Sequence, residues 1–113
     1  MTFLFSASRQ VHEWQPAVDI YRTPEGWLLK FDLAGVRLDD VQVHVSRRSV
    51  RVAGVRKDRL EEAGCRHYSM EITYSRFSRT VDLPEEVQGA NVSVEYRDGI
   101  LHVRISAHGS ERT

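Results

Sequence analysis

The chain has 113 residues, which is the length of one domain, and its apolar share of 41% and charged share of 28% are those of a globular protein. Its 16 lysines and arginines balance its 16 aspartates and glutamates, and a net charge of zero argues against a dedicated binder of nucleic acid or anionic membrane. One cysteine cannot form a disulfide within the chain, and no apolar run reaches the length of a signal peptide or a membrane span, so we expect a cytoplasmic location.

The first half of the chain carries the period-two alternation of half-buried β-strands. A short arm over residues 1–15 precedes the domain, which we expect to span residues 16–106. Apolar residues occupy every second position of four segments, 18–21, 27–33, 41–46 and 50–54. The residues between these segments are turn formers, such as Thr23-Pro24-Glu25-Gly26 and Ala34-Gly35.

The second half of the chain begins with a charged stretch at residues 56–67. Its brevity and Gly64 favour a long loop over a helix. Alternation then returns in four segments, 68–74, 77–83, 92–97 and 101–105, and Asp98-Gly99 predicts a tight hairpin between the last two. A polar tail follows at residues 107–113. About eight short strands without a convincing helix predict an all-β fold, an immunoglobulin-like β-sandwich of two antiparallel sheets.

Several motifs, taken in order over residues 14–106, resemble those of the small heat-shock protein, or α-crystallin, family. They are Trp14-Gln15-Pro16-Ala17-Val18-Asp19-Ile20-Tyr21, Phe31-Asp32-Leu33-Ala34-Gly35-Val36, Val52-Ala53-Gly54-Val55-Arg56-Lys57, Tyr74-Ser75-Arg76-Phe77-Ser78-Arg79, Leu83-Pro84, and Ala90 with Asp98-Gly99-Ile100-Leu101. The family usually has proline in place of Ala34 and glycine in place of Ser75. The resemblance is closer to bacterial and plant members than to metazoan ones because of the long loop at residues 55–75.

This resemblance implies an ATP-independent chaperone, a holdase that binds unfolding proteins and prevents their aggregation under stress. It also implies a homodimer formed by strand exchange, in which the loop at residues 55–75 carries the exchanged strand. The further partners that we expect are unfolding client proteins and ATP-dependent refolding chaperones, with no nucleic acid and no membrane. No glycine-rich phosphate loop follows a strand, so we expect no nucleotide cofactor and no other cofactor.

Two sets of site residues follow from the resemblance. In the implied dimer, the segment 68–74 of one copy pairs with the segment 18–21 of the other. The residues expected at this interface are Val18, Ile20, Tyr21, Tyr68, Met70, Ile72, Tyr74 and Arg79. A groove for clients or for a neighbour's tail is implied beside segments 41–46 and 92–97, lined by Val41, Val43, Val45, Val92, Val94 and Tyr96. The alternative is that these valines are simply core, which must hold for one face of each strand.

Arg79 falls in phase with Phe77, Val81 and Leu83. A charge on an apolar face costs on the order of several kcal/mol unless it finds partners. The resemblance implies that this arginine braces the dimer. The alternative is a β-bulge that turns Arg79 outward.

No constellation in the sequence predicts catalysis or a metal site. The five histidines are dispersed over strands, loop and arms: His12, His44, His67, His102 and His108. Cys65 lies two residues from His67, but two potential ligands do not make a site that needs three or four, and no third group is there to orient them. An enzyme is therefore the class that we expect least.

Two rival functions stay open at this point. One is a co-chaperone-like binding module without holdase activity, and the other is a subunit that assembles with a longer paralogue. The second is suggested by the tail, because Val103-Arg104-Ile105 has the spacing of the family's Ile-x-Ile docking motif but lies in the last strand. Residues 107–113 offer no aliphatic pair, so we expect assemblies smaller or less regular than the family's large shells.

Overall fold

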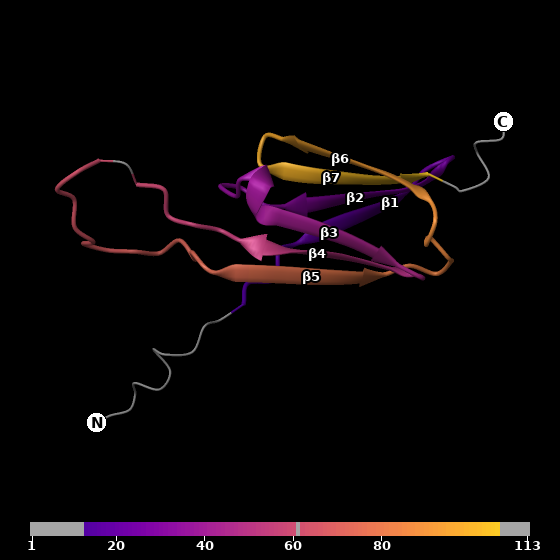
Figure 1. The fold of residues 1–113 in the computed structure, drawn as a ribbon, viewed down its shortest axis with the longest axis horizontal. Coiled ribbons are helices and arrows are strands. Elements are labelled where there is room, and N and C mark those ends of the chain that lie inside the picture. Colours follow the sequence, from indigo (N-terminus) through magenta and orange to yellow (C-terminus); the bar gives the residue numbers. More distant parts are fainter. Residues whose placement is uncertain (1–12, 61, 107–113) are drawn as a thin grey trace, which may run out of the picture.

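The computed structural model describes residues 13–60 and 62–106, and β-strands dominate this part of the chain (Figure 1). The strands are β1 (Val18–Arg22), β2 (Gly26–Asp32), β3 (Val41–Ser46), β4 (Ser49–Val55), β5 (Arg76–Asp82), β6 (Asn91–Arg97) and β7 (Ile100–Ser106). A single turn of 3-10 helix, η1 (Leu38–Asp40), precedes β3. The all-β prediction is confirmed.

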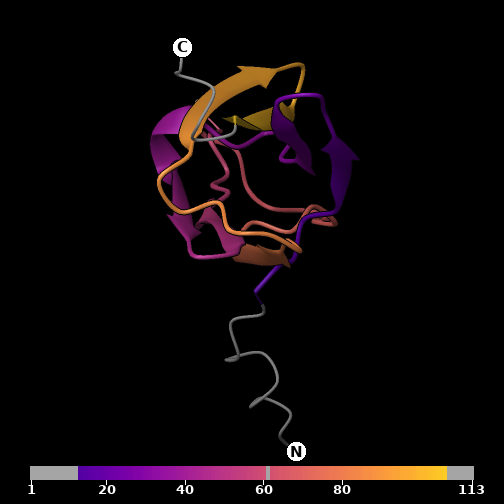
Figure 2. The same ribbon diagram turned by 90° about the vertical axis from the view of Figure 1, so that its right-hand side faces the viewer.

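The strands form two antiparallel sheets that face each other (Figure 2). One sheet has four strands in the order β1-β2-β7-β6, and the other has three in the order β3-β4-β5. Trp14 pairs with Phe77 of β5 just before the chain enters β1, so β1 and β5 lie on the same side of the sandwich. The outer strands β6 and β3 therefore lie together on the opposite side. This is the β-sandwich that the sequence predicted.

The core fills the space between the sheets with alternate residues of each strand. The largest fully buried side chains include Phe31 of β2, Phe77 of β5 and Leu101 of β7. Phe31 pairs with Leu101 across the β2–β7 ladder, which places both on the inner face. Burying a side chain of this size contributes about 1.5–3 kcal/mol. The core thus follows the period-two pattern from which the strands were predicted.

Two tight turns use residues with positive φ. Asp98 (φ 52°) and Gly99 (φ 79°) form the two-residue connection between β6 and β7, the geometry that lets two strands twist together. Arg47 (φ 46°) begins the equivalent connection between β3 and β4. The carbonyl of Arg47 accepts hydrogen bonds from the backbone N–H groups of Val87 and Gln88, which fastens this turn to the segment before β6.

The segment 68–74, expected to pair as an exchanged strand with a second copy, forms no strand within the single chain. Residues 56–75 form one long loop that extends past the end of the sandwich, and within its described residues no strand is assigned (Figure 1). The loop closes at its root, where the Arg56 N–H donates to the carbonyl of Ser75. A strand needs a neighbouring edge to satisfy its backbone groups, and the loop carries this segment away from the edges of its own sandwich.

Candidate functional site

β1 forms one margin of the four-stranded sheet and presents two large side chains to solvent. Ile20 pairs with Leu29 and so belongs to the inner face, yet it is exposed because β1 is the outer strand. Tyr21 is on the outer face, where the ammonium of Lys30 lies over its ring at 5.2 Å from the centroid. Val18 is partly buried against the core. The three β1 residues predicted at a dimer interface therefore lie along one strand, with two of them accessible.

The loop presents the other half of that predicted interface. Tyr68 is fully exposed, Ile72 is 60% exposed, and Met70 and Tyr74 are also exposed. Exposed apolar residues scattered singly are ordinary, but here four of them alternate with polar residues within seven positions of one loop segment. Within the described residues, this stretch contributes nothing to the core.

Arg79 stays on the inner face of β5. The β4–β5 pairing runs without interruption from Val55 opposite Arg76 to Ser49 opposite Asp82, so the alternative of a bulge in this strand is wrong. The side chain is partly buried, and its Nη1 donates a hydrogen bond of 2.9 Å to the carbonyl of Pro16. Arg79 thereby joins β5 to the segment that enters β1.

The outer strands β3 and β6 carry the valines predicted to line a groove. Val92 and Val94 pair with Ile105 and Val103, which places them on the inner face, yet they are 40% and 41% exposed. The β3 valines pack against the core and are partly buried: Val41, Val43 and Val45. The β3 valines therefore contribute to the core, whereas Val92 and Val94 add to the accessible margin of β6.

Tyr96 differs from the valines beside it. Its hydroxyl donates a hydrogen bond of 2.8 Å to the carbonyl of Leu33, which ties β6 to the end of β2. The ring is partly buried and packs against the core. The hydroxyl of Tyr96, a residue predicted to line the groove, is therefore occupied by a hydrogen bond within the domain.

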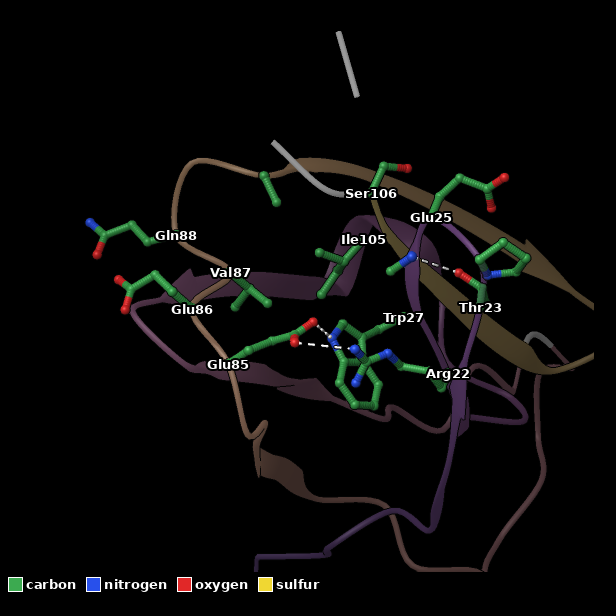
Figure 3. Close-up of a pocket in the computed structure, with 13 residues that line it drawn as sticks. Arg22, Thr23, Glu25, Trp27, Glu85, Glu86, Val87, Gln88, Ile105 and Ser106 are labelled. Carbon is green, nitrogen blue, oxygen red and sulfur yellow. Dashed lines mark hydrogen bonds and ion pairs between the residues drawn. The ribbon is translucent and has the colours of Figure 1, made fainter. Parts of the chain in front are cut away.

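A pocket of about 240 Å³, which no sequence motif predicted, lies at the end of the sandwich where β7 ends (Figure 3). Trp27, Val87 and Ile105 are among its lining residues. Glu85 accepts a hydrogen bond of 3.0 Å from the indole N–H of Trp27 and pairs with Arg22 at 3.2 Å. Residues 58 positions apart make this contact, so no local pattern could have revealed it.

Among the described residues, the histidines and the cysteine lie in different elements, apart from Cys65 and His67, which share the loop. Cys65 and His67 are exposed in the loop, His44 is exposed on β3, and His102 is partly buried on β7. In residues 13–60 and 62–106, no group of three or more His, Cys, Asp or Glu side chains is arranged to hold a metal ion. His12, His108, the apolar arm residues 3–5 and the tail 107–113 lie outside the described residues.

No helix in the described part of the chain is long and apolar enough to cross a membrane.

Comparison with known proteins places the chain in a family. The model of the Hsp20/alpha crystallin family matches residues 19–113. Spore protein SP21 of Stigmatella aurantiaca is 36% identical over 76% of this chain and 51% of its own length. The 22.7 kDa class IV heat shock protein of Pisum sativum is 33% identical over 74% of this chain and 43% of its own length. The chain therefore spans about half the length of these curated relatives.

Solved structures agree with the fold. Heat shock protein 16.0 from Schizosaccharomyces pombe superposes with a TM-score of 0.76 at 22% identity, covering 89% of this chain and 94% of that one. HspA from Xanthomonas axonopodis superposes with a TM-score of 0.66 at 26% identity, covering 84% and 95%. With the match of the family model to residues 19–113, these likenesses lead to one conclusion: the chain belongs to the Hsp20/alpha crystallin family, the small heat shock proteins.

Proposed function

We propose that this chain is an ATP-independent holdase, which binds unfolding proteins and prevents their aggregation. Its family generally acts in this way. The observation that carries the proposal is that the folded chain exposes large apolar side chains that are not part of its hydrophobic core. Val92 and Val94 supply such surface on β6, and the loop residues from Tyr68 to Tyr74 supply it beside the sandwich.

The geometry suits the capture of extended, apolar segments. An unfolding client can add to an outer strand through main-chain hydrogen bonds, and alternate side chains then meet the apolar residues of that strand. The binding free energy comes from burying apolar area, about 25 cal/mol per Å², and needs no nucleotide. Because this contribution is non-directional, one surface serves many client sequences.

We also propose that two copies form a homodimer by strand exchange. The loop segment 68–74 would pair with β1 of the second copy, since both present exposed apolar side chains. Arg79, bound to the Pro16 carbonyl beside the entry to β1, would brace that side of the dimer. A loop of this length, with no helix or strand in its described residues 56–60 and 62–75, is uncommon in a compact domain, and a binding role accounts for its length.

The proposal extends to the partners and the location of the chain. ATP-dependent refolding chaperones would receive the held clients, and the cytoplasm is the location that we assign. A co-chaperone-like module is the rival, and it would show neither a dimer nor suppression of aggregation. A subunit that works only with a longer paralogue would suppress aggregation only after mixing.

Light scattering of a heat-labile client, with and without the protein, tests the holdase proposal. We expect suppression that does not change with added ATP or with a chelator. The variant Val94→Thr keeps the size of the side chain but adds a hydroxyl to the apolar margin of β6, and should weaken suppression. Ser93→Thr, on the outer face of the same strand, is the matched control. Suppression that requires ATP, or is lost with chelator, would refute the proposal.

A further inference from the structure

Arg56 stands at the root of the long loop, where the chain leaves β4. Its Nε donates a hydrogen bond of 2.9 Å to the carbonyl of Thr73, on the returning limb of the loop. Its Nη1 donates a second bond of 3.0 Å to the carbonyl of Ala34, in the turn that follows β2. One side chain therefore joins the two limbs of the loop to each other and to the sandwich.

The same guanidinium reaches the residue that leads in from the amino-terminal arm. The central carbon of the Arg56 guanidinium lies 3.8 Å from the centroid of the Trp14 ring. Trp14 also packs edge-to-face on Phe77, with centroids 5.4 Å apart. Its N–H donates to the carbonyl of Arg76, and its carbonyl accepts from the N–H of Ser78. Trp14 is thus fixed to β5 by its backbone and to the loop root by Arg56.

The chemistry of this cluster requires arginine. A planar guanidinium has donors on several sides and a face that stacks on an aromatic ring, so it serves two carbonyls and the Trp14 ring at once. A lysine ammonium is a point charge and cannot meet all three in one position. Lys57, the next residue, is exposed and makes one ion pair, 3.7 Å from Asp40. The two neighbouring cations therefore differ in role.

We propose that Arg56 is a positioning residue that fixes the root of the loop and couples it to Trp14. Displacement of Trp14 removes the ring on which Arg56 stacks and loosens the loop at Thr73. The segment 68–74 then changes its direction more freely, and exchanged dimers trade subunits faster. The part of this inference that concerns subunit trading rests on the strand exchange proposed above.

Hydrogen–deuterium exchange of the full chain tests the fixing of the loop. We expect Arg56→Ala and Arg56→Lys to raise exchange of the backbone amides of residues 56 and 14, which donate to the carbonyls of Ser75 and Arg76 at the loop root, by about tenfold, the factor for one lost charge-assisted hydrogen bond. Lys57→Ala removes the same charge one residue away and should leave this exchange unchanged. Acrylamide quenching of Trp14 fluorescence, measured in a Trp27→Phe background, should also rise in the Arg56 variants alone. Unchanged exchange in Arg56→Ala would overturn the proposal.

A double-mutant cycle tests the coupling. Trp14→Ala should raise exchange of the residue 56 amide, which donates to the Ser75 carbonyl, as Arg56→Ala does, and the double variant should add little to either single change. Fully additive effects would show that the two residues act separately and would refute the coupling. Subunit trading, followed by energy transfer between labelled dimers, should quicken in the same variants. A monomeric wild-type chain would refute strand exchange, while the amide exchange and quenching results would still decide the role of Arg56.

Discussion

Glu85 illustrates how single residues hold the two sheets together at the end of the sandwich. Its carboxylate accepts from the Trp27 indole and pairs with Arg22, whose guanidinium also lies 4.5 Å from the centroid of the Trp27 ring (Figure 3). Glu85 belongs to the segment that crosses from β5 of one sheet to β6 of the other. The contact therefore fastens this crossover to β2.

Replacing Glu85 tests the value of that contact. We expect Glu85→Ala to lower the free energy of unfolding by about 1 kcal/mol, because the Trp27 N–H loses a charged acceptor while the exposed ion pair with Arg22 adds little. Glu86→Ala, at the next exposed position, should stay within about 0.5 kcal/mol of the wild type. Urea titration followed by circular dichroism measures both variants. Equal stability of the two would contradict the role given to Glu85.

Gly54 is required by a close approach of two backbone segments. A Cβ at this position would collide with the carbonyl oxygen of Asp40 and lie 2.8 Å from Cζ of Phe77. We expect Gly54→Ala to cost about 2–3 kcal/mol, since neither the backbone nor the buried ring can move away freely. Gly64→Ala in the loop has no atom within 4 Å of the new Cβ and should cost less despite its positive φ. Thermal unfolding ranks the two variants, and a larger loss for Gly64→Ala would contradict this reasoning.

At the scale of residues, the sequence predicted which side chains face inward but not which polar groups meet. Alternation placed Arg79 in phase with Phe77, and the structure keeps it there. The acceptors of Arg56 and of Trp27 could not be predicted, because they come from segments 17 to 58 positions away. Such contacts depend on the packing of whole elements, which periodicity does not encode.

At the scale of elements, the loop 56–75 is the part that carries the proposed strand exchange. Deleting residues 58–73 leaves four residues between Val55 and Arg76, enough to close β4 and β5 as a hairpin. We expect the deletion variant to be a folded monomer, because the segment that pairs with the other copy is gone. Light scattering after size-exclusion chromatography gives its mass, and circular dichroism checks its fold. A variant that keeps the mass of a wild-type dimer would rule out strand exchange.

Elements defined by local residues were predicted best. The β6–β7 hairpin follows from Asp98-Gly99, because these two residues accept the positive φ angles that the turn needs. The segment 68–74 has the same alternation as a true strand but forms none in this chain. Alternation predicts that a segment can form a strand. It does not predict which strand the segment pairs with, because the partner is determined by how the other elements are arranged. This is why seven of about eight predicted strands are present.

At the scale of the whole molecule, the outer strands β3 (Val41–Ser46) and β6 (Asn91–Arg97) form one side of the sandwich, called here the β3–β6 margin. This is where we expect a peptide to add to the sandwich. We expect a peptide with an Ile-x-Ile motif to bind there, since burying two isoleucine side chains contributes about 3–6 kcal/mol before entropic costs. Val94→Asp places a charge on this margin and should abolish binding, whereas Glu95→Asp on the outer face should not. Fluorescence anisotropy of a labelled peptide measures both. Equal affinity for the two variants would place the peptide elsewhere.

The hydrophobic core draws none of its buried members from the described residues of the loop, 56–60 and 62–75. In the proposed dimer, two equilibria are therefore separate: the folding of the sandwich, which is independent of concentration, and the association of copies, which obeys mass action. Dilution would dissociate the dimer without unfolding either copy. Each monomer would then expose the apolar residues that had been buried in the dimer interface. The supply of client-binding surface would then be set by how much protein is present as well as by how hot it is.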